Sequence, residues 1–233
     1  MSDHEDMFPR LVPVFPLPGC VLFPGAVLPL HVYESRYRAM ARGVLEKSSD
    51  DRLIAIALLR PGFQDLYQTP HAPIHHVVCV GRVIEHEQLA DDRFNLLLLG
   101  FSRAVIVGED QTGEFRKAHV SPLPSAGAKD ASTESELREA IGELMKEATD
   151  EKLIHPAVVN HLLANTPRLE HCIDLLTYHL LPAEDSELKQ RVLEENNVSI
   201  RVRILTRWLR NTIDEHKYAR DTTRAWPPEP SPN

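Results

Sequence analysis

A segment crowded with proline and glycine near the start of the chain limits what this sequence can fold into. Residues 15–25 read Phe-Pro-Leu-Pro-Gly-Cys-Val-Leu-Phe-Pro-Gly, in which two apolar-Pro-Gly runs bracket an apolar triplet. Each proline fixes φ and removes a backbone donor, while Gly19 and Gly25 can adopt the positive φ that a sharp reversal needs. The segment therefore cannot be a regular central strand. We expect it to cross between strands and to lead into a helix at Glu34.

The first 120 residues predict short strands around a single helix. Apolar runs of strand length, bounded by proline, glycine or polar turns, cover 11–15, 27–32, 52–59, 77–86, 94–99, 103–107 and 115–120. Pro29 makes the second run an edge strand or a bulged one. Residues 34–47 switch to a helical period. Many short strands with one helix and no βαβ alternation predict a mixed barrel or sandwich.

The rest of the chain predicts helices. Residues 121–131, rich in Pro, Ser, Ala and Gly, indicate a linker. Helical apolar stripes follow over 134–148, 156–163, 168–181 and 184–195. Residues 198–204 also fit strand alternation, but a helical stripe continues to Ile213, and its length favours a helix. We therefore predict an α+β protein with a β-rich domain 1–120, a linker 121–131, a helical subdomain 132–220 and a disordered tail 221–233.

Composition narrows the class of protein. The 233 residues are 42% hydrophobic and 26% charged, with a formal net charge of -8, which disfavours binding to nucleic-acid phosphates. Three widely spaced cysteines indicate free thiols in a reducing compartment. The acidic N-terminus lacks the pattern of a signal peptide, and no apolar run is long enough to span a membrane. We expect a soluble, cytoplasmic protein.

Two motifs resemble the N-terminal domain of Lon proteases. The first is the segment 15–25 with its continuation to Tyr37, whose Tyr-Glu-x-Arg-Tyr ending is typical of small stand-alone members. The second is 92–103, a turn and an apolar strand followed by Gly100, two variable residues and Arg103; a weaker third match covers 189–201. The resemblance spans most of 11–213. It implies a PUA-like β-barrel followed by a helical bundle, and binding of unfolded or tagged polypeptide.

The other modules of a Lon protease leave no mark in the sequence. No GxxxxGK[ST] phosphate loop occurs. Ser125 lies in a Pro-Ser-Ala-Gly context like that of the family's peptidase serine, but it falls in the predicted linker, where nothing positions Lys129 or Lys146 as a base. We therefore predict no catalytic residue, and a peptidase S16-like chain that is not proteolytic and not an enzyme.

The histidines and charged side chains near the motifs favour structural roles. The 12 histidines include no HExxH and no i, i+4 helical pair, so we predict neither a metal site nor a cofactor. Glu34 is expected to stabilise the start of the helix that follows it. Arg103 is expected to pair with an acidic group of the barrel.

Exposed aromatic and apolar side chains give the candidate binding residues. Because rigid barrels present function on their loops and strand ends, we predict a peptide-binding site at Tyr33, Phe63, Leu66, Tyr67 and Phe101. The alternative is that the loop 63–67 packs back on the barrel. The expected partners are unfolded or exposed hydrophobic polypeptide segments, with self-association left open.

Two other functions remain open at this point. One is an RNA-binding PUA-like module, supported by a possible basic strip of Arg201, Arg203, Arg207 and Arg210 beside Trp208. The other is an enzyme whose site is built from several loops and leaves no local motif.

Overall fold

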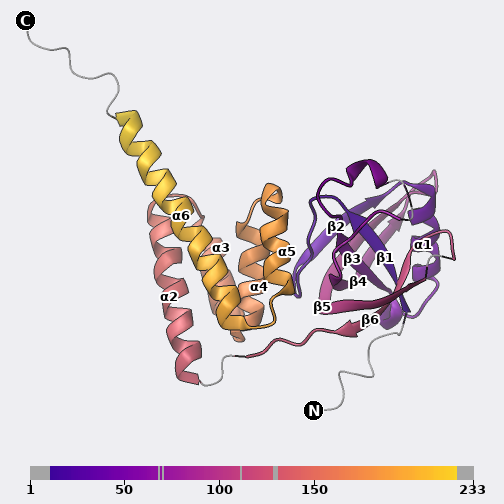
Figure 1. The fold of residues 1–233 in the computed structure, drawn as a ribbon, viewed down its shortest axis with the longest axis horizontal. Coiled ribbons are helices and arrows are strands. Elements are labelled where there is room, and N and C mark those ends of the chain that lie inside the picture. The colour runs from indigo at the N-terminus through magenta and orange to yellow at the C-terminus, as the bar shows by residue number, and fades with distance from the viewer. Residues whose placement is uncertain (1–10, 68, 70, 111, 128–130, 225–233) are drawn as a thin grey trace, which may run out of the picture. The chain divides into compact units, whose positions relative to one another are not determined.

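The chain forms two compact units in the computed structural model, which describes residues 11–67, 69, 71–110, 112–127 and 131–224 (Figure 1). The first unit contains the chain up to Ala126 together with Asp174–Asn196, and the second contains Gly127–Ile173 and the chain from Asn197 onward. The division at 126 falls inside the predicted linker. Residues 174–196 group with the strands, whereas the sequence predicts them in the helical subdomain 132–220. Whether 1–120 and 132–220 fold as independent domains stays a prediction.

Six strands make the mixed sheet of the first unit. They are β1 (Leu11–Leu17), β2 (Val27–Val32), β3 (Leu53–Leu58), β4 (Val77–Gln88), β5 (Phe94–Asp110) and β6 (Lys117–Pro122). Strand β1 runs parallel to β3, and all other pairs are antiparallel. Pairing in the order β1-β3-β4-β5-β6 returns to β1, so five strands close a ring and β2 adds to β5. The predicted α+β fold with a mixed barrel is confirmed.

Strand β5 is longer than the sequence pattern indicates. The runs 94–99 and 103–107, predicted as separate strands, form one strand of 17 residues. Its first part, up to Leu99, pairs with β2, and its part from Ala104 onward pairs with β6. Strand β5 therefore changes its pairing partner from β2 to β6 along its length, and Gly100 lies between the two paired parts.

The proline-rich segment crosses between β1 and β2 as expected. Gly19 has φ 66° and Gly25 has φ 80°, which confirms the predicted reversals. The Gly25 N–H donates to the Gly100 carbonyl, and the Gly100 N–H donates to the Ala26 carbonyl, each at 2.8 Å. These two bonds fasten the end of the crossing segment to the middle of β5.

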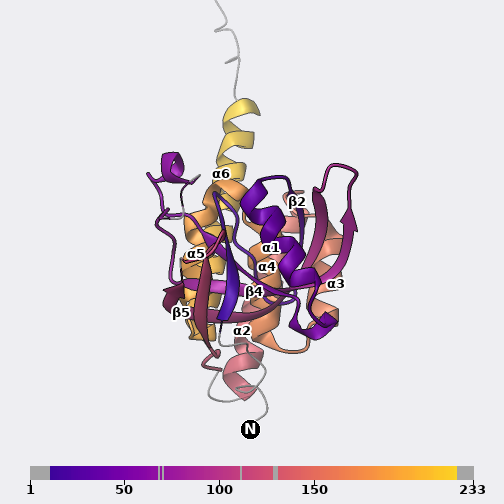
Figure 2. The same cartoon turned by 90° about the vertical axis from the view of Figure 1, so that its right-hand side faces the viewer.

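One helix and two short 3-10 turns are inserted between the strands. Helix α1 (Ser35–Leu45) lies within the predicted 34–47, and Figure 2 shows it together with strand β2. Its buried face is made by Tyr37, Met40, Ala41 and Val44. The turns are η1 (Ser49–Asp51) and η2 (Gln64–Leu66). Because α1 starts three residues after β2 ends, the junction between them is held at the end of the barrel.

Five helices and one 3-10 turn follow the strands. They are α2 (Ala131–Asp150), α3 (Pro156–Asn165), α4 (Leu169–Leu180), η3 (Ala183–Asp185), α5 (Ser186–Glu194) and α6 (Val198–Arg224). Residues 198–213 are helical, as their length predicted, and the stripe from Val198 to Ile213 is buried. Helix α6 continues to Arg224, so 221–224 of the predicted disordered tail are helical, and 225–233 lie outside the described residues. No helix in the described part of the chain is long and apolar enough to cross a membrane.

Arg103 joins α5 to the barrel within the first unit. Arg103 is 3% exposed, and its guanidinium donates to the carbonyls of Leu193 at 3.0 Å and Glu195 at 2.6 Å. It also donates to the Ser125 hydroxyl at 3.0 Å. Two backbone carbonyls and a hydroxyl are thus acceptors of Arg103. The predicted pairing with an acidic group of the barrel stays a prediction.

Candidate functional site

An apolar cavity of about 290 Å³ lies where β1 ends, β2 ends and the η2 turn meets α1. It is lined by Phe15, Leu17, Pro18, Cys20, Leu30, His31, Val32, Tyr33, Glu34, Tyr37 and Tyr67. We call it the Tyr33–Tyr67 cavity. Concave apolar sites with a few placed polar groups are the usual form of binding sites. Its residues come from three parts of the chain that only the closed barrel brings together.

A polar network holds the η2 turn against the start of α1. The Tyr67 hydroxyl donates to Glu34 Oε1 at 3.0 Å, and Arg36 Nη2 donates to Glu34 Oε2 at 3.1 Å. Arg36 also donates to the Tyr67 carbonyl at 2.7 Å, and its guanidinium carbon lies 4.5 Å from the centre of the Tyr37 ring. Glu34 stands at the N-cap of α1, but its side chain makes no capping hydrogen bond. Its role is to fix Tyr67 at the rim of the cavity.

Burial keeps the Cys20 thiol and the Tyr37 and Tyr67 hydroxyls of the cavity protonated at neutral pH. Burial raises the pKa of Cys20 to about 11, against a weaker opposing effect of Lys189. Burial raises the pKa of Tyr37 to about 12, and it also raises the pKa of Tyr67, with the negative charge of Glu34 adding to the effect. The Glu34 carboxylate is paired with Arg36. The cavity therefore offers no activated nucleophile and suits an uncharged apolar group.

Cys20 gives a direct test of this environment. With a pKa of about 11, its thiolate fraction at pH 8 is roughly a hundredfold below that of an ordinary thiol, so alkylation of the folded protein by iodoacetamide should be slower by about that factor. The alkylation rate should rise about tenfold per pH unit up to pH 10, because the fraction of Cys20 present as thiolate rises by that factor below its pKa. Peptide mass mapping of timed samples measures it. Labelling of Cys20 as fast in the folded as in the urea-unfolded protein contradicts a buried, protonated thiol.

The structure brings together four of the five predicted binding residues. Tyr33 and Tyr67 both line the cavity, and Tyr33 is 61% exposed. Phe63 and Leu66, each 40% exposed, lie just before and at the end of the η2 turn that leads into Tyr67, and the Leu66 N–H donates to the Phe63 carbonyl. Tyr67 packs on the barrel core. The alternative that the loop 63–67 packs back on the barrel therefore holds for Tyr67. The peptide-binding role of these residues stays a prediction.

Phe101 lies elsewhere. It is half-buried on β5 and is not among the residues that line the Tyr33–Tyr67 cavity. The Arg82 guanidinium carbon lies 4.8 Å from the centre of its ring. Cys20 and Phe15 line the cavity but were not among the predicted site residues, because nothing local in the sequence separates a cavity-lining thiol or ring from a core one.

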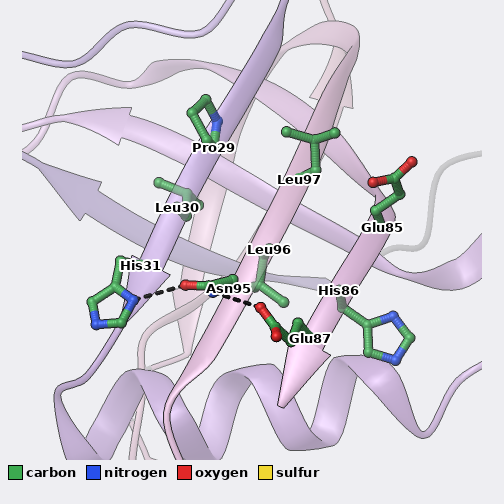
Figure 3. Close-up of a pocket in the computed structure, with 9 residues that line it drawn as sticks. All are labelled: Pro29, Leu30, His31, Glu85, His86, Glu87, Asn95, Leu96 and Leu97. Atoms are coloured by element: carbon green, nitrogen blue, oxygen red, sulfur yellow. Dashed lines mark hydrogen bonds between the residues drawn. The ribbon is translucent and has the colours of Figure 1, made fainter. Parts of the chain in front are cut away.

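A second cavity, of about 450 Å³, lies beside the first and shares Leu30 and His31 with it. Figure 3 shows its residues on β2, β5 and β4. His31 Nδ1 lies 2.8 Å from Asn95 Oδ1, and Asn95 Nδ2 donates to Glu87 Oε2 at 2.9 Å, so one polar row crosses all three strands. The pairs Pro29–Leu97 and Val27–Leu99 form apolar rows on the same face. The outer face of these strands is therefore apolar toward Val27 and acidic toward Glu87.

Two sequence features that suggested chemistry take structural roles. Ser125 accepts a hydrogen bond from Arg103. His75 lies 3.0 Å from Glu194 and 3.4 Å from Glu187, both of which belong to α5. The described residues hold no group of three or more His, Cys, Asp or Glu that could bind a metal ion. The predictions that no metal and no cofactor are bound stay predictions.

Two solved structures share the architecture described above. The N-terminal domain of the Mycobacterium avium complex Lon protease has a TM-score of 0.63 and 18% identity, and the likeness covers 86% of this chain and 98% of that one. The Lon N-terminal domain protein from Xanthomonas campestris has a TM-score of 0.57 and 18% identity, covering 85% and 98%. At this identity the likeness concerns the fold alone. It places the chain in the class of domains with the fold of Lon N-terminal domains.

Comparison of sequences narrows this class to a family. Residues 11–211 match the family of the ATP-dependent protease La (LON) substrate-binding domain. Lon protease 2 of Myxococcus xanthus is 26% identical over 216 residues, which cover 88% of this chain and 24% of that protein. Lon protease of Anaeromyxobacter dehalogenans is 25% identical over 212 residues, which cover 88% and 23%. The chain thus spans about a quarter of the length of the curated relatives it matches.

The protein belongs to the family of Lon substrate-binding domains, since the matched model extends over most of its length. The resemblance drawn from the two motifs is confirmed. The 233 residues contain no ATPase or peptidase domain, and the matched domain is the part of a Lon protease that carries no catalysis.

Proposed function

We propose that this domain binds unfolded polypeptide through the Tyr33–Tyr67 cavity, as a recognition domain without catalytic activity. The observation that carries the proposal is the coincidence of a mainly apolar cavity, whose one carboxylate is paired with Arg36, with a largely exposed aromatic ring, Tyr33, at its rim. A hydrophobic side chain of an unfolded segment would lose water on entering the cavity and would pack on Tyr33 and Tyr67. Phe63 and Leu66 would extend the apolar contact along the η2 turn.

Membership in a substrate-binding family supports a protein as the partner. RNA binding receives less support, because Arg201 is fully buried and is lost from the basic strip that the sequence suggested. Arg210 lies 3.8 Å from the Glu147 carboxylate, which offsets part of the remaining positive charge. We place the function in the cytoplasm, where Cys20, Cys79 and Cys172, all free in the structure, would remain thiols.

The affinity for a permanently unfolded chain tests the proposal. Reduced and carboxymethylated α-lactalbumin, labelled with fluorescein, serves as the probe in an anisotropy titration. Tyr33→Ala should weaken binding about tenfold or more, as expected for an aromatic anchor at the edge of a pocket. Because Tyr33 is 61% exposed, the melting temperature should stay close to that of the wild type.

Val107→Ala is the matched control. Val107 is 67% exposed on β5 and does not line the cavity, so this variant should bind like the wild type. Equal affinity of the wild type and Tyr33→Ala would remove the cavity from the binding site. Failure of the wild type to bind the unfolded chain would refute the proposed function itself.

A further inference from the structure

Strand β2 has one edge that pairs with no other strand in the described part of the chain. The Ala26 carbonyl accepts from Gly100 of β5, so backbone groups alternate from there: Leu28, Leu30 and Val32 face β5, and Val27, Pro29 and His31 face away. The bond from the Tyr178 hydroxyl to the Val27 carbonyl, 3.0 Å long, agrees with this direction.

Most of this outer edge is already blocked. Pro29 has no N–H to donate, and the Val27 carbonyl accepts from Tyr178. Only His31, at the end of the strand nearest to Tyr33, offers both its N–H and its carbonyl, while Val27 keeps its N–H and Pro29 its carbonyl. Proteins protect free strand edges with proline and short strands, so an edge with one complete donor and acceptor pair is selective in what it can accept.

The Tyr33–Tyr67 cavity runs along this open part of the edge. Residues 30–32 of β2 and residues 33 and 34 after it all line the cavity. Successive side chains of an extended strand point to opposite faces, so a cavity that touches residues 30, 31 and 32 reaches the edge of the strand as well as one face. The other edge of β2 is occupied by β5. A chain segment laid beside His31 would therefore turn every second side chain into the apolar cavity.

The remaining side chains of such a segment would meet a face on which negative charge predominates, because Arg93, whose Nη1 lies 3.4 Å from His31 Nε2, is itself paired with Asp91 at 2.6 Å. They would lie on the outer face, where the second cavity contains Glu85 and Glu87 (Figure 3). Because Glu87 bonds Asn95, its carboxylate is held over β5, two strand spacings or about 10 Å from an added strand. That distance is within the reach of a lysine or arginine side chain and within about one Debye length. The two faces favour apolar residues alternating with basic ones.

We propose that the domain captures an extended polypeptide segment as an added strand beside His31, with an apolar side chain in the Tyr33–Tyr67 cavity and a Lys or Arg on the Glu87 face. This inference rests on the proposed function and specifies the conformation and charge of the substrate. Pairing of the whole of β2 with a second copy of this chain is disfavoured, because neither Pro29 could donate an N–H and Tyr178 would have to leave the Val27 carbonyl.

A pair of substitutions at His31 isolates the backbone donor. His31→Ala and His31→Pro both remove the imidazole and its bond to Asn95, but only proline also removes the outward N–H. Pro29 two residues earlier shows that the edge accepts proline. The probe is an acetylated ten-residue peptide in which Val alternates with Lys. We expect His31→Pro to bind it about threefold to tenfold more weakly than His31→Ala, the effect of one lost hydrogen bond.

Two further variants test the geometry. N-methylation of the peptide at alternate residues should weaken binding in one register and leave it unchanged in the other, because only every second amide faces β2. Glu87→Gln keeps a side chain that can bond Asn95, and should weaken the Val-Lys peptide but not a Val-Thr peptide. Circular dichroism and melting curves verify that each variant is folded.

The outcomes separate this inference from the proposed function. Suppose that carboxymethylated α-lactalbumin binds through Tyr33, but the affinity for the peptide is the same with and without N-methylation and the same in His31→Ala and His31→Pro. Strand addition is then overturned and the proposed function stands. If neither probe binds, both fail. If sedimentation shows a dimer that His31→Pro dissociates, a second copy occupies the edge and strand addition by substrate is overturned.

Discussion

Gly100→Ala is expected to destabilise the first unit by about 3 to 5 kcal/mol, a large part of the stability of a typical domain. A Cβ added at Gly100 would lie 1.9 Å from the Phe23 carbonyl oxygen, so the crossing segment and β5 would have to separate. That movement would break the two backbone bonds that join Gly100 to Gly25 and Ala26. Urea unfolding followed by circular dichroism, with hydrogen exchange of the β5 amides to report on the first unit, measures the loss, since Trp208 and Trp226 both lie outside that unit.

Gly108→Ala, in the same strand, is the control for the loss of a glycine. A Cβ at Gly108 meets nothing within 4 Å, so this change should alter the free energy of unfolding by less than about 1 kcal/mol. If the two variants unfold at the same urea concentration, the close contact between the crossing segment and β5 is not present in solution.

Arg103→Met is expected to cost about 3 to 5 kcal/mol as well. Methionine matches much of the volume of arginine but leaves the carbonyls of Leu193 and Glu195 without this donor. Because the Arg103 side chain is buried, water cannot fully replace it. Hydrogen exchange should show the amides of α5 opening more readily than those of β3 and β4, since Arg103 bonds the end of α5 to the barrel.

Two milder variants define the origin of this effect. Arg103→Lys keeps the charge but cannot reach several acceptors with a planar fork, so it should recover only part of the loss. Ser125→Ala removes one acceptor and should cost about 1 kcal/mol. A cost of less than about 1 kcal/mol for Arg103→Met would show that Arg103 does not hold α5 to the strands.

Local sequence pattern predicted most elements of this fold, because periodicity and turn residues act over short distances. The reversals at Gly19 and Gly25, the edge strand with Pro29 and the long helix α6 all followed from such patterns. The merging of two runs into β5 did not, since Gly100 reads as a strand end in isolation. The grouping of 174–196 with the barrel depends on bonds such as Gln190 to the Val77 carbonyl, 113 residues away.

The candidate site was predictable only in part, for the same reason. Exposed rings near loops indicated Tyr33 and Tyr67, which line one cavity. Phe101 fitted the same rule but lies under Arg82. The free strand edge at His31 could not be predicted from the local sequence, because it depends on which strands pair and on the hydrogen bond from the Tyr178 hydroxyl to Val27.

The central claim is that unfolded polypeptide binds at the Tyr33–Tyr67 cavity. Hydrogen–deuterium exchange with and without saturating carboxymethylated α-lactalbumin, read by mass spectrometry, tests it most directly. We predict that protection on binding is concentrated in residues 30–37 and 63–67, and that Tyr33→Ala reduces it. Protection confined to the helices of the second unit, or none at saturation, would contradict the claim.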